Sequence, residues 1–208
     1  IEMNIFLHEI RTYLRTTLVW IAALCAVTVF LFSMYPAFSG NADALTEVLG
    51  NYPAVVRLAF GLMAEKIGTV NGFFSFIVSF LALVGAVQAM TLGLNLLGRE
   101  KTGRTEEFLL TKPVRRARIV GAKLLAGCAL IAATWAAFGA VCLAGATAFA
   151  GGLADRAGFG MLFLTFPVAQ ALFLALGFAA SAVLPRIRSV LPVSLSSVFA
   201  LFAVGAVA

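Results

Sequence analysis

The sequence has very little charge and therefore very little of the polarity that a water-soluble protein needs. Only 12% of its 208 residues are charged, 62% are hydrophobic, and the mean hydropathy is +1.04. Such a chain cannot cover a water-soluble globule with polar surface. The composition excludes a soluble domain and predicts an integral membrane protein.

Histidine and cysteine are also scarce. His8 is the single histidine, and Cys25, Cys128 and Cys142 fall inside apolar runs without the spacing of metal ligands. We expect the cysteines to act as small hydrophobic residues. Metal-dependent and nucleophilic catalysis have no support, so we predict that the chain is not an enzyme.

Long apolar runs are abundant. Crossing about 30 Å of hydrocarbon takes roughly 20 helical residues, and the runs lack the alternation of a transmembrane barrel. The predicted fold class is an all-α polytopic helical bundle, one transmembrane domain over residues 1–208. Five spans would leave the C-terminus outside, and the last eight residues, 201–208, have no polar cap or anchoring aromatic, so we expect a sixth span beyond those seen here. The predicted spans lie at about 16–34, 71–98, 124–153, 159–184 and 190–208.

Basic residues indicate the orientation. Of the 15 lysines and arginines, all but Arg57, Lys66 and Arg156 lie on the side of the N-terminus and of the loop at 99–123. Positively charged loops stay cytoplasmic, so we predict a multi-pass protein of the cell inner (plasma) membrane with a cytoplasmic N-terminus. This placement explains the net charge of +6 without a nucleic-acid partner. The expected topology anchors are Arg115, Arg116, Arg118, Lys123, Arg186 and Arg188.

Two polar segments flank the first span. Residues 3–15 are amphipathic and are predicted to form a helix in the cytoplasmic interface, with a simple extension of the first span as the alternative. The external loop at 35–70 is predicted to hold two short helices, one capped by Asn41 and one begun by Pro53. They could gate a pathway or cover the bundle.

The spans contain no deep charge, which constrains how transport could be driven. Carriers coupled to protons or sodium normally need ionisable groups at membrane depth. Here Gln88, Asn95 and Gln170 are the strongest polar groups and the possible pathway residues. We favour interhelical hydrogen bonds for them, worth about 0.5–2 kcal/mol each. Energy for uphill transport would then enter from outside the bilayer.

A false phosphate-binding pattern follows the second span. Residues 98–105 match G-x-x-x-x-G-K-[ST] except that Arg104 replaces the lysine. A true loop of this kind joins a buried strand to a helix within a soluble domain, whereas this one leaves a membrane span. We expect any ATP to be bound by another chain.

The residues that follow predict a short docking helix. Thr105 can cap it, Glu106 and Glu107 suit the positive end of its dipole, and Pro113 ends it. Its apolar residues could dock in a groove of a soluble protein or dip into lipid.

A family resemblance decides between these readings. Residues 104–123 resemble the signature (K/G)-T-x-E-F-L-L-(T/S)-x-P-V-(S/R)-R-x-x-I-x-x-x-K of type-2 ABC transporter permeases, and the resemblance extends to residues 6–11, 35–38 and 85–95. It implies a permease subunit of an ATP-binding cassette transporter whose coupling helix docks on a cytosolic ABC ATPase subunit. The coupling residues would be Thr105, Glu106, Glu107, Phe108, Leu109, Leu110, Thr111 and Lys112.

The resemblance also implies partners and cofactors. ATP and magnesium would be bound by the partner ATPase and no cofactor by this chain. A second permease copy or paralogue would complete the substrate pathway, which fits efflux. The alternative is an ATP-independent channel, scaffold or assembly subunit that the basic residues anchor to anionic lipid.

Overall fold

The computed structural model describes residues 2–41, 47–48, 51–53, 69–103, 116–150, 156–183 and 189–207. Within these ranges the regular structure is helical throughout, which confirms the all-α fold class. The helices are α1 (Glu2–Ser33), α2 (Tyr35–Gly40), α5 (Val70–Gly103), α7 (Arg116–Ala150), α8 (Arg156–Val183) and α9 (Val190–Val207).

Length and composition allow the long helices to cross a membrane. Candidate spans lie at Asn4–Gly40, Val70–Gly98, Ala117–Phe149 and Ala157–Val183. They correspond to the first four predicted spans and support a multi-pass membrane protein. The fifth predicted span corresponds to α9, whose apolar part, Val190–Gly205, is shorter.

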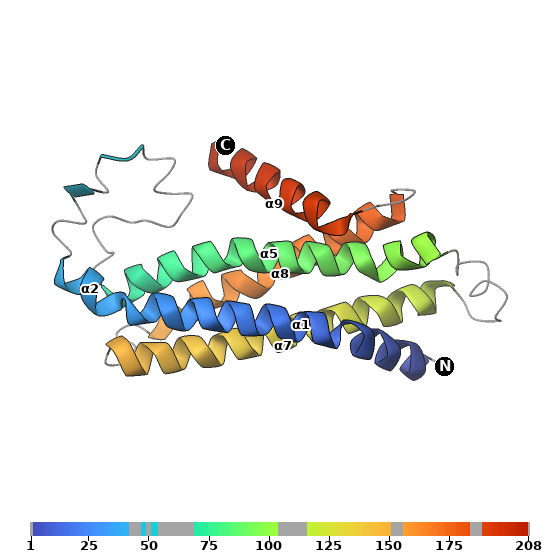
Figure 1. Cartoon of the computed structure of the whole chain (residues 1–208), viewed down its shortest axis with the longest axis horizontal. Helices are drawn as coiled ribbons and strands as arrows, with labels where there is room; N and C mark the ends of the chain where they lie inside the picture. The colour runs from blue at the N-terminus through green and yellow to red at the C-terminus, as the bar shows by residue number, and fades with distance from the viewer. Residues whose placement is uncertain are drawn as a thin grey trace.

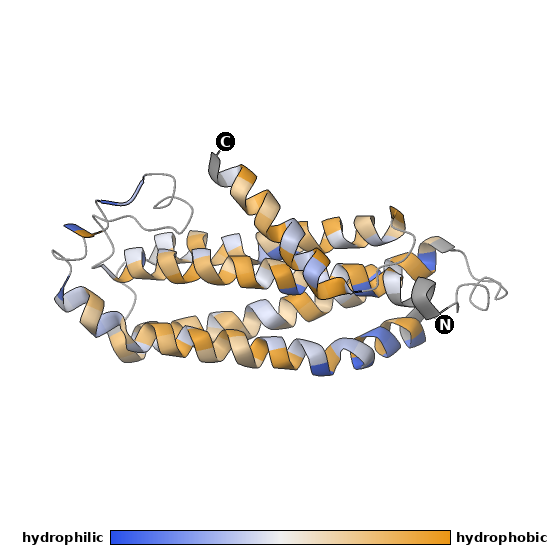
Figure 2. Cartoon of the chain, turned by 45° about the horizontal axis from the view of Figure 1, so that its top comes forward, coloured by the Kyte–Doolittle hydropathy of each residue, from blue (hydrophilic) through white to orange (hydrophobic). Residues whose placement is uncertain are grey.

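The N-terminal polar segment is helical but is not a separate helix. Residues 3–15 continue without a break into the first span as part of α1, which is the arrangement of the alternative that we considered. Figure 2 shows that this end of α1 is more hydrophilic than the rest of the helix. One face of it packs on the bundle, because Glu9 and Tyr13 are buried.

The start of the external loop differs from the prediction. Residues 35–40 form α2, with Pro36 in its first turn, where the missing N–H costs no hydrogen bond. Asn41 closes this helix, and its side-chain amide donates to the carbonyl of Ala37 at 3.0 Å. Most residues of the two predicted loop helices lie outside the described ranges.

The long helices pair in an order that differs from their order in the chain. Figure 1 shows α1, α5, α7 and α8 along the long axis, with α9 diverging from them. The most extensive packing is of α5 on α8 and of α1 on α7, and α9 packs mainly on α5. As a result α5 touches every other long helix in the described part of the chain.

Two glycines allow α5 and α8 to cross backbone against backbone. A Cβ on Gly93 would lie 2.5 Å from the carbonyl oxygen of Leu174, and one on Gly177 would lie 2.5 Å from that of Met90. No side chain fits into such a space. Small residues at helix crossings are a common way to pack membrane helices closely.

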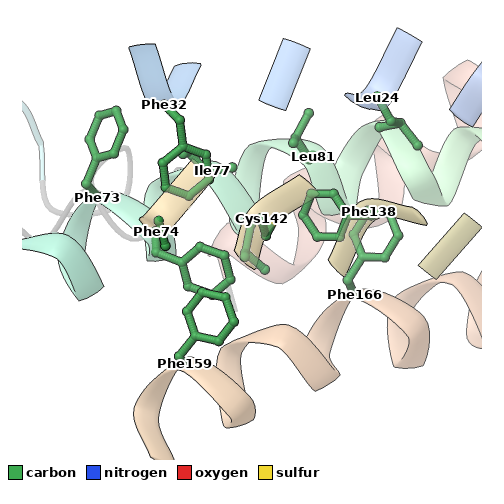
Figure 3. Packing of buried hydrophobic residues seen from close by; sticks show 12 residues of the cluster. Leu24, Phe32, Phe73, Phe74, Ile77, Leu81, Phe138, Cys142, Phe159 and Phe166 are labelled. Atoms are coloured by element: carbon green, nitrogen blue, oxygen red, sulfur yellow. The ribbon is translucent and has the colours of Figure 1, made fainter. Parts of the chain in front are cut away.

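Aromatic rings fill the core at the end of the bundle near α2 (Figure 3). The rings of Phe74 and Phe159 stack with centroids 4.0 Å apart, and those of Phe138 and Phe166 stack at 4.4 Å. Phe32 and Cys142 are buried in the same cluster. The contacts join α1, α5, α7 and α8, so they hold this end of the bundle together.

Candidate functional site

The predicted coupling segment lies in the chain between α5 and α7. Helix α5 runs to Gly103 and α7 begins at Arg116. Figure 1 shows both ends at the same end of the bundle as the N-terminus of α1. The coupling residues 105–112 lie outside the described ranges, as do Arg115, Arg186 and Arg188. The described structure therefore shows the helix ends that precede and follow this segment in the chain.

A buried ion pair ties these three helix ends together. The Lys123 ammonium of α7 lies 2.7 Å from the Glu9 carboxylate of α1 and donates to the carbonyl oxygen of Leu96 in α5 at 2.8 Å. Lys123 is 2% exposed and Glu9 is 8% exposed. Both charged groups are shielded from water. Their contact with each other, and that of the ammonium with the Leu96 carbonyl, compensate for the lost hydration.

The predicted topology anchors therefore differ in their surroundings. Arg118 is exposed, as a residue at a membrane–water boundary would be. Lys123 is instead enclosed among α1, α5 and α7. Nothing in the sequence indicates its contact with Glu9.

Two of the predicted polar groups form a network inside the bundle. The Gln88 amide of α5 donates to the Thr134 hydroxyl of α7 at 3.0 Å, and the Gln170 amide of α8 donates to the Gln88 carbonyl at 3.3 Å. All three residues are buried. This is the interhelical hydrogen bonding that we favoured for the glutamines.

Two further contacts join α5 to its neighbours. The Thr91 hydroxyl bonds to the Ser194 hydroxyl of α9 at 2.9 Å, and the Tyr13 hydroxyl of α1 donates to the backbone carbonyl of Asn95 at 2.9 Å. The Asn95 side-chain amide instead donates to the backbone carbonyl of Thr91 in its own helix at 2.8 Å, which differs from the interhelical bond that we expected for it. Thus α1, α7, α8 and α9 are each hydrogen-bonded to α5. We call this set of contacts the α5 polar network.

A small cavity lies along the network between α1 and α5. Its volume is about 20 Å³, enough for a water molecule but too small for an organic solute. Its lining residues are Tyr13, Thr16, Thr17, Trp20, Gln88, Thr91, Leu92 and Asn95. The cavity offers hydroxyl and amide groups and no charged side chain. In the described part of the chain no cluster of His, Cys, Asp or Glu could hold a metal ion.

Several of these residues escaped the sequence analysis for different reasons. Thr91 shares a helical face with Gln88 and Asn95, and that spacing is a signal that could have been used. Thr134, Ser194 and Tyr13 carry no such signal, because their roles depend on which helices are neighbours.

The family comparison agrees with the membrane bundle and with the signature around the coupling segment. The family model described as "ABC-2 family transporter protein" matches residues 3–208. Neither a curated protein nor a solved structure matches the chain. The chain is a transmembrane permease and belongs to the ABC-2 transporter family.

Proposed function

We propose that this chain forms the substrate pathway of an ABC exporter and is driven by a separate cytosolic ATPase that docks on residues 105–112. In this proposal the helix ends at Gly103 and Arg116 face the cytoplasm of the cell. ATP and magnesium are bound by the ATPase, and closure of two ATPases moves the coupling segments of two permease subunits.

The α5 polar network is the observation that carries the proposal. Helix α5 leads into the coupling segment and is hydrogen-bonded to α1, α7, α8 and α9. A force applied beyond Gly103 would therefore reach each long neighbour of α5 through a direct contact.

The distribution of charge supports an external energy source. No charged residue occurs between Leu124 and Ala150 or between Ala157 and Val183. The buried Glu9–Lys123 pair lies instead at the end of the bundle where the coupling segment begins. Ion-driven transport would need such groups along the pathway.

The small cavity supports a pathway shared with a second permease copy or paralogue. At about 20 Å³ this cavity is too small to hold an organic solute. An interface between two bundles provides the space, and the exposed apolar faces of the helices suit an apolar cargo.

The direct test is co-purification with the ATPase. Membranes solubilised in mild detergent should yield this chain together with an ABC ATPase, and Phe108→Asp should abolish that recovery and ATP-dependent transport. Phe149→Asp is the matched control, because it makes the same change at the opposite end of α7 and should leave the ATPase bound. Recovery of no ATPase, or unchanged recovery with Phe108→Asp, would refute the proposal.

A further inference from the structure

The Glu9–Lys123 ion pair connects helix ends that are far apart in the chain. It joins residues 114 apart in the chain and connects the first turns of α1 to the first turns of α7. The same ammonium also bonds to Leu96, seven residues before the end of α5. These ends of α1, α5 and α7 are thus held together by one side chain.

Stability alone is a weak reason for such a pair. Removing two charges from water is costly, and replacing a buried pair with apolar residues of similar size is often neutral or stabilising. Leucine or methionine at both positions would pack the three helices without that cost. A buried pair does fix one relative position of its helices, because a shift of either partner leaves a charge without compensation.

We infer that Glu9 and Lys123 are positioning residues that make the N-terminal part of α1 move together with the α5–α7 hairpin during the transport cycle. This inference rests on the proposed coupling to an ATPase. Through the chain, the N-terminal part of α1 is connected to residues 105–112 only by way of the rest of α1, the external loop and α5. With the pair intact, movement of the hairpin carries α1 with it. Without the pair, the Tyr13–Asn95 hydrogen bond and apolar packing still connect them, but α1 follows the hairpin less closely.

Distance measurements between spin labels test the inference in the complex of permease and ATPase. One pair of labels replaces His8 and Ala117, which are exposed and flank the ion pair on α1 and α7. A second pair, at Ala117 and the exposed Met161 of α8, reports the movement of the bundle itself. Cys25, Cys128 and Cys142 are replaced by alanine in every protein. The double variant Glu9→Met/Lys123→Met removes the pair while keeping unbranched side chains that can pack, and Arg11→Met is the control for loss of a nearby exposed charge.

The expected result separates positioning from folding. In the labelled protein with the ion pair intact, and in its Arg11→Met variant, the 8–117 distance stays constant when ATP and vanadate are added, while the 117–161 distance changes. In the double variant the 117–161 distance still changes, and the 8–117 distance now shifts or broadens with ATP. A purely structural role would alter the 8–117 distance equally with and without nucleotide.

Two results would overturn the inference. If the 8–117 distance in the double variant is as constant as in the unmodified pair, the ion pair does not join the movements, although the proposed function stands. If the 117–161 distance does not respond to ATP in any protein, the proposed function fails and the inference fails with it. Should the double variant not fold, Glu9→Leu/Lys123→Leu, which likewise removes both charges, gives the same comparison.

Discussion

The close crossing of α5 and α8 predicts that alanine at Gly93 or Gly177 weakens the bundle. Each new Cβ would lie 2.5 Å from a backbone carbonyl oxygen, whereas ordinary van der Waals contact begins at 3.4 Å. The two helices would have to move apart by about 0.9 Å at this point, because the obstructing atoms are backbone and cannot rotate away.

The cost can be judged by comparison with a glycine that has free space. At Gly160, also in α8, a Cβ would meet nothing within 4 Å. Gly→Ala within a helix gains about 1 kcal/mol of helix propensity at every one of these positions, so the difference between variants reports packing. Overpacking costs about 1–3 kcal/mol. The separation also stretches the Gln170–Gln88 hydrogen bond, which is already 3.3 Å long.

We therefore expect Gly93→Ala and Gly177→Ala to be about 1–3 kcal/mol less stable than Gly160→Ala. Reversible unfolding of the purified protein by SDS in mixed micelles, followed by tryptophan fluorescence, measures the free energy of unfolding. The double variant should cost less than the sum of the single ones, because the first alanine already separates the helices for the second. Equal stability of all three single variants would refute the reasoning.

Two further predictions follow from the polar contacts. Thr134→Val removes the acceptor of the buried Gln88 amide and should lower the free energy of unfolding by about 0.5–2 kcal/mol in the same SDS titration. Thr147→Val is the control and should have little effect, because its exposed hydroxyl bonds only within its own helix. Glu9→Met alone leaves the Lys123 ammonium buried without its carboxylate and should lower the free energy of unfolding by about 3–5 kcal/mol. Glu9→Met/Lys123→Met removes both charges and should unfold near the midpoint of the unmodified protein. Similar losses in both variants would contradict this account.

The sequence predicted the positions of the helices far better than it predicted which helices pack against each other. The span predicted at 71–98 lies within α5, which continues to Gly103 because a helix need not end where charge begins. The span predicted at 124–153 corresponds to α7, which begins at Arg116 for the same reason. Hydropathy marks the apolar part of a helix and not its ends.

The candidate site was predictable only where a residue was conspicuous by itself. Gln88 and Gln170 stand out as amides in apolar runs, and both are part of the α5 polar network. Nothing in the sequence joins Glu9 to Lys123 or Gly93 to Gly177. Those contacts depend on which helices are neighbours, and helices that are all similarly apolar do not reveal this in their hydropathy.

The pairing of α1 with α7 has a consequence for biogenesis. During synthesis α1 enters the membrane before its main packing partner exists, and the carboxylate of Glu9 precedes its lysine by 114 residues. Helix α5 likewise precedes α8. The first two spans therefore cannot complete their packing as a hairpin and must remain loosely associated until α7 and α8 have been inserted. The nascent permease depends for that interval on the insertion machinery, or on lipid, to shelter the polar groups that the finished bundle encloses.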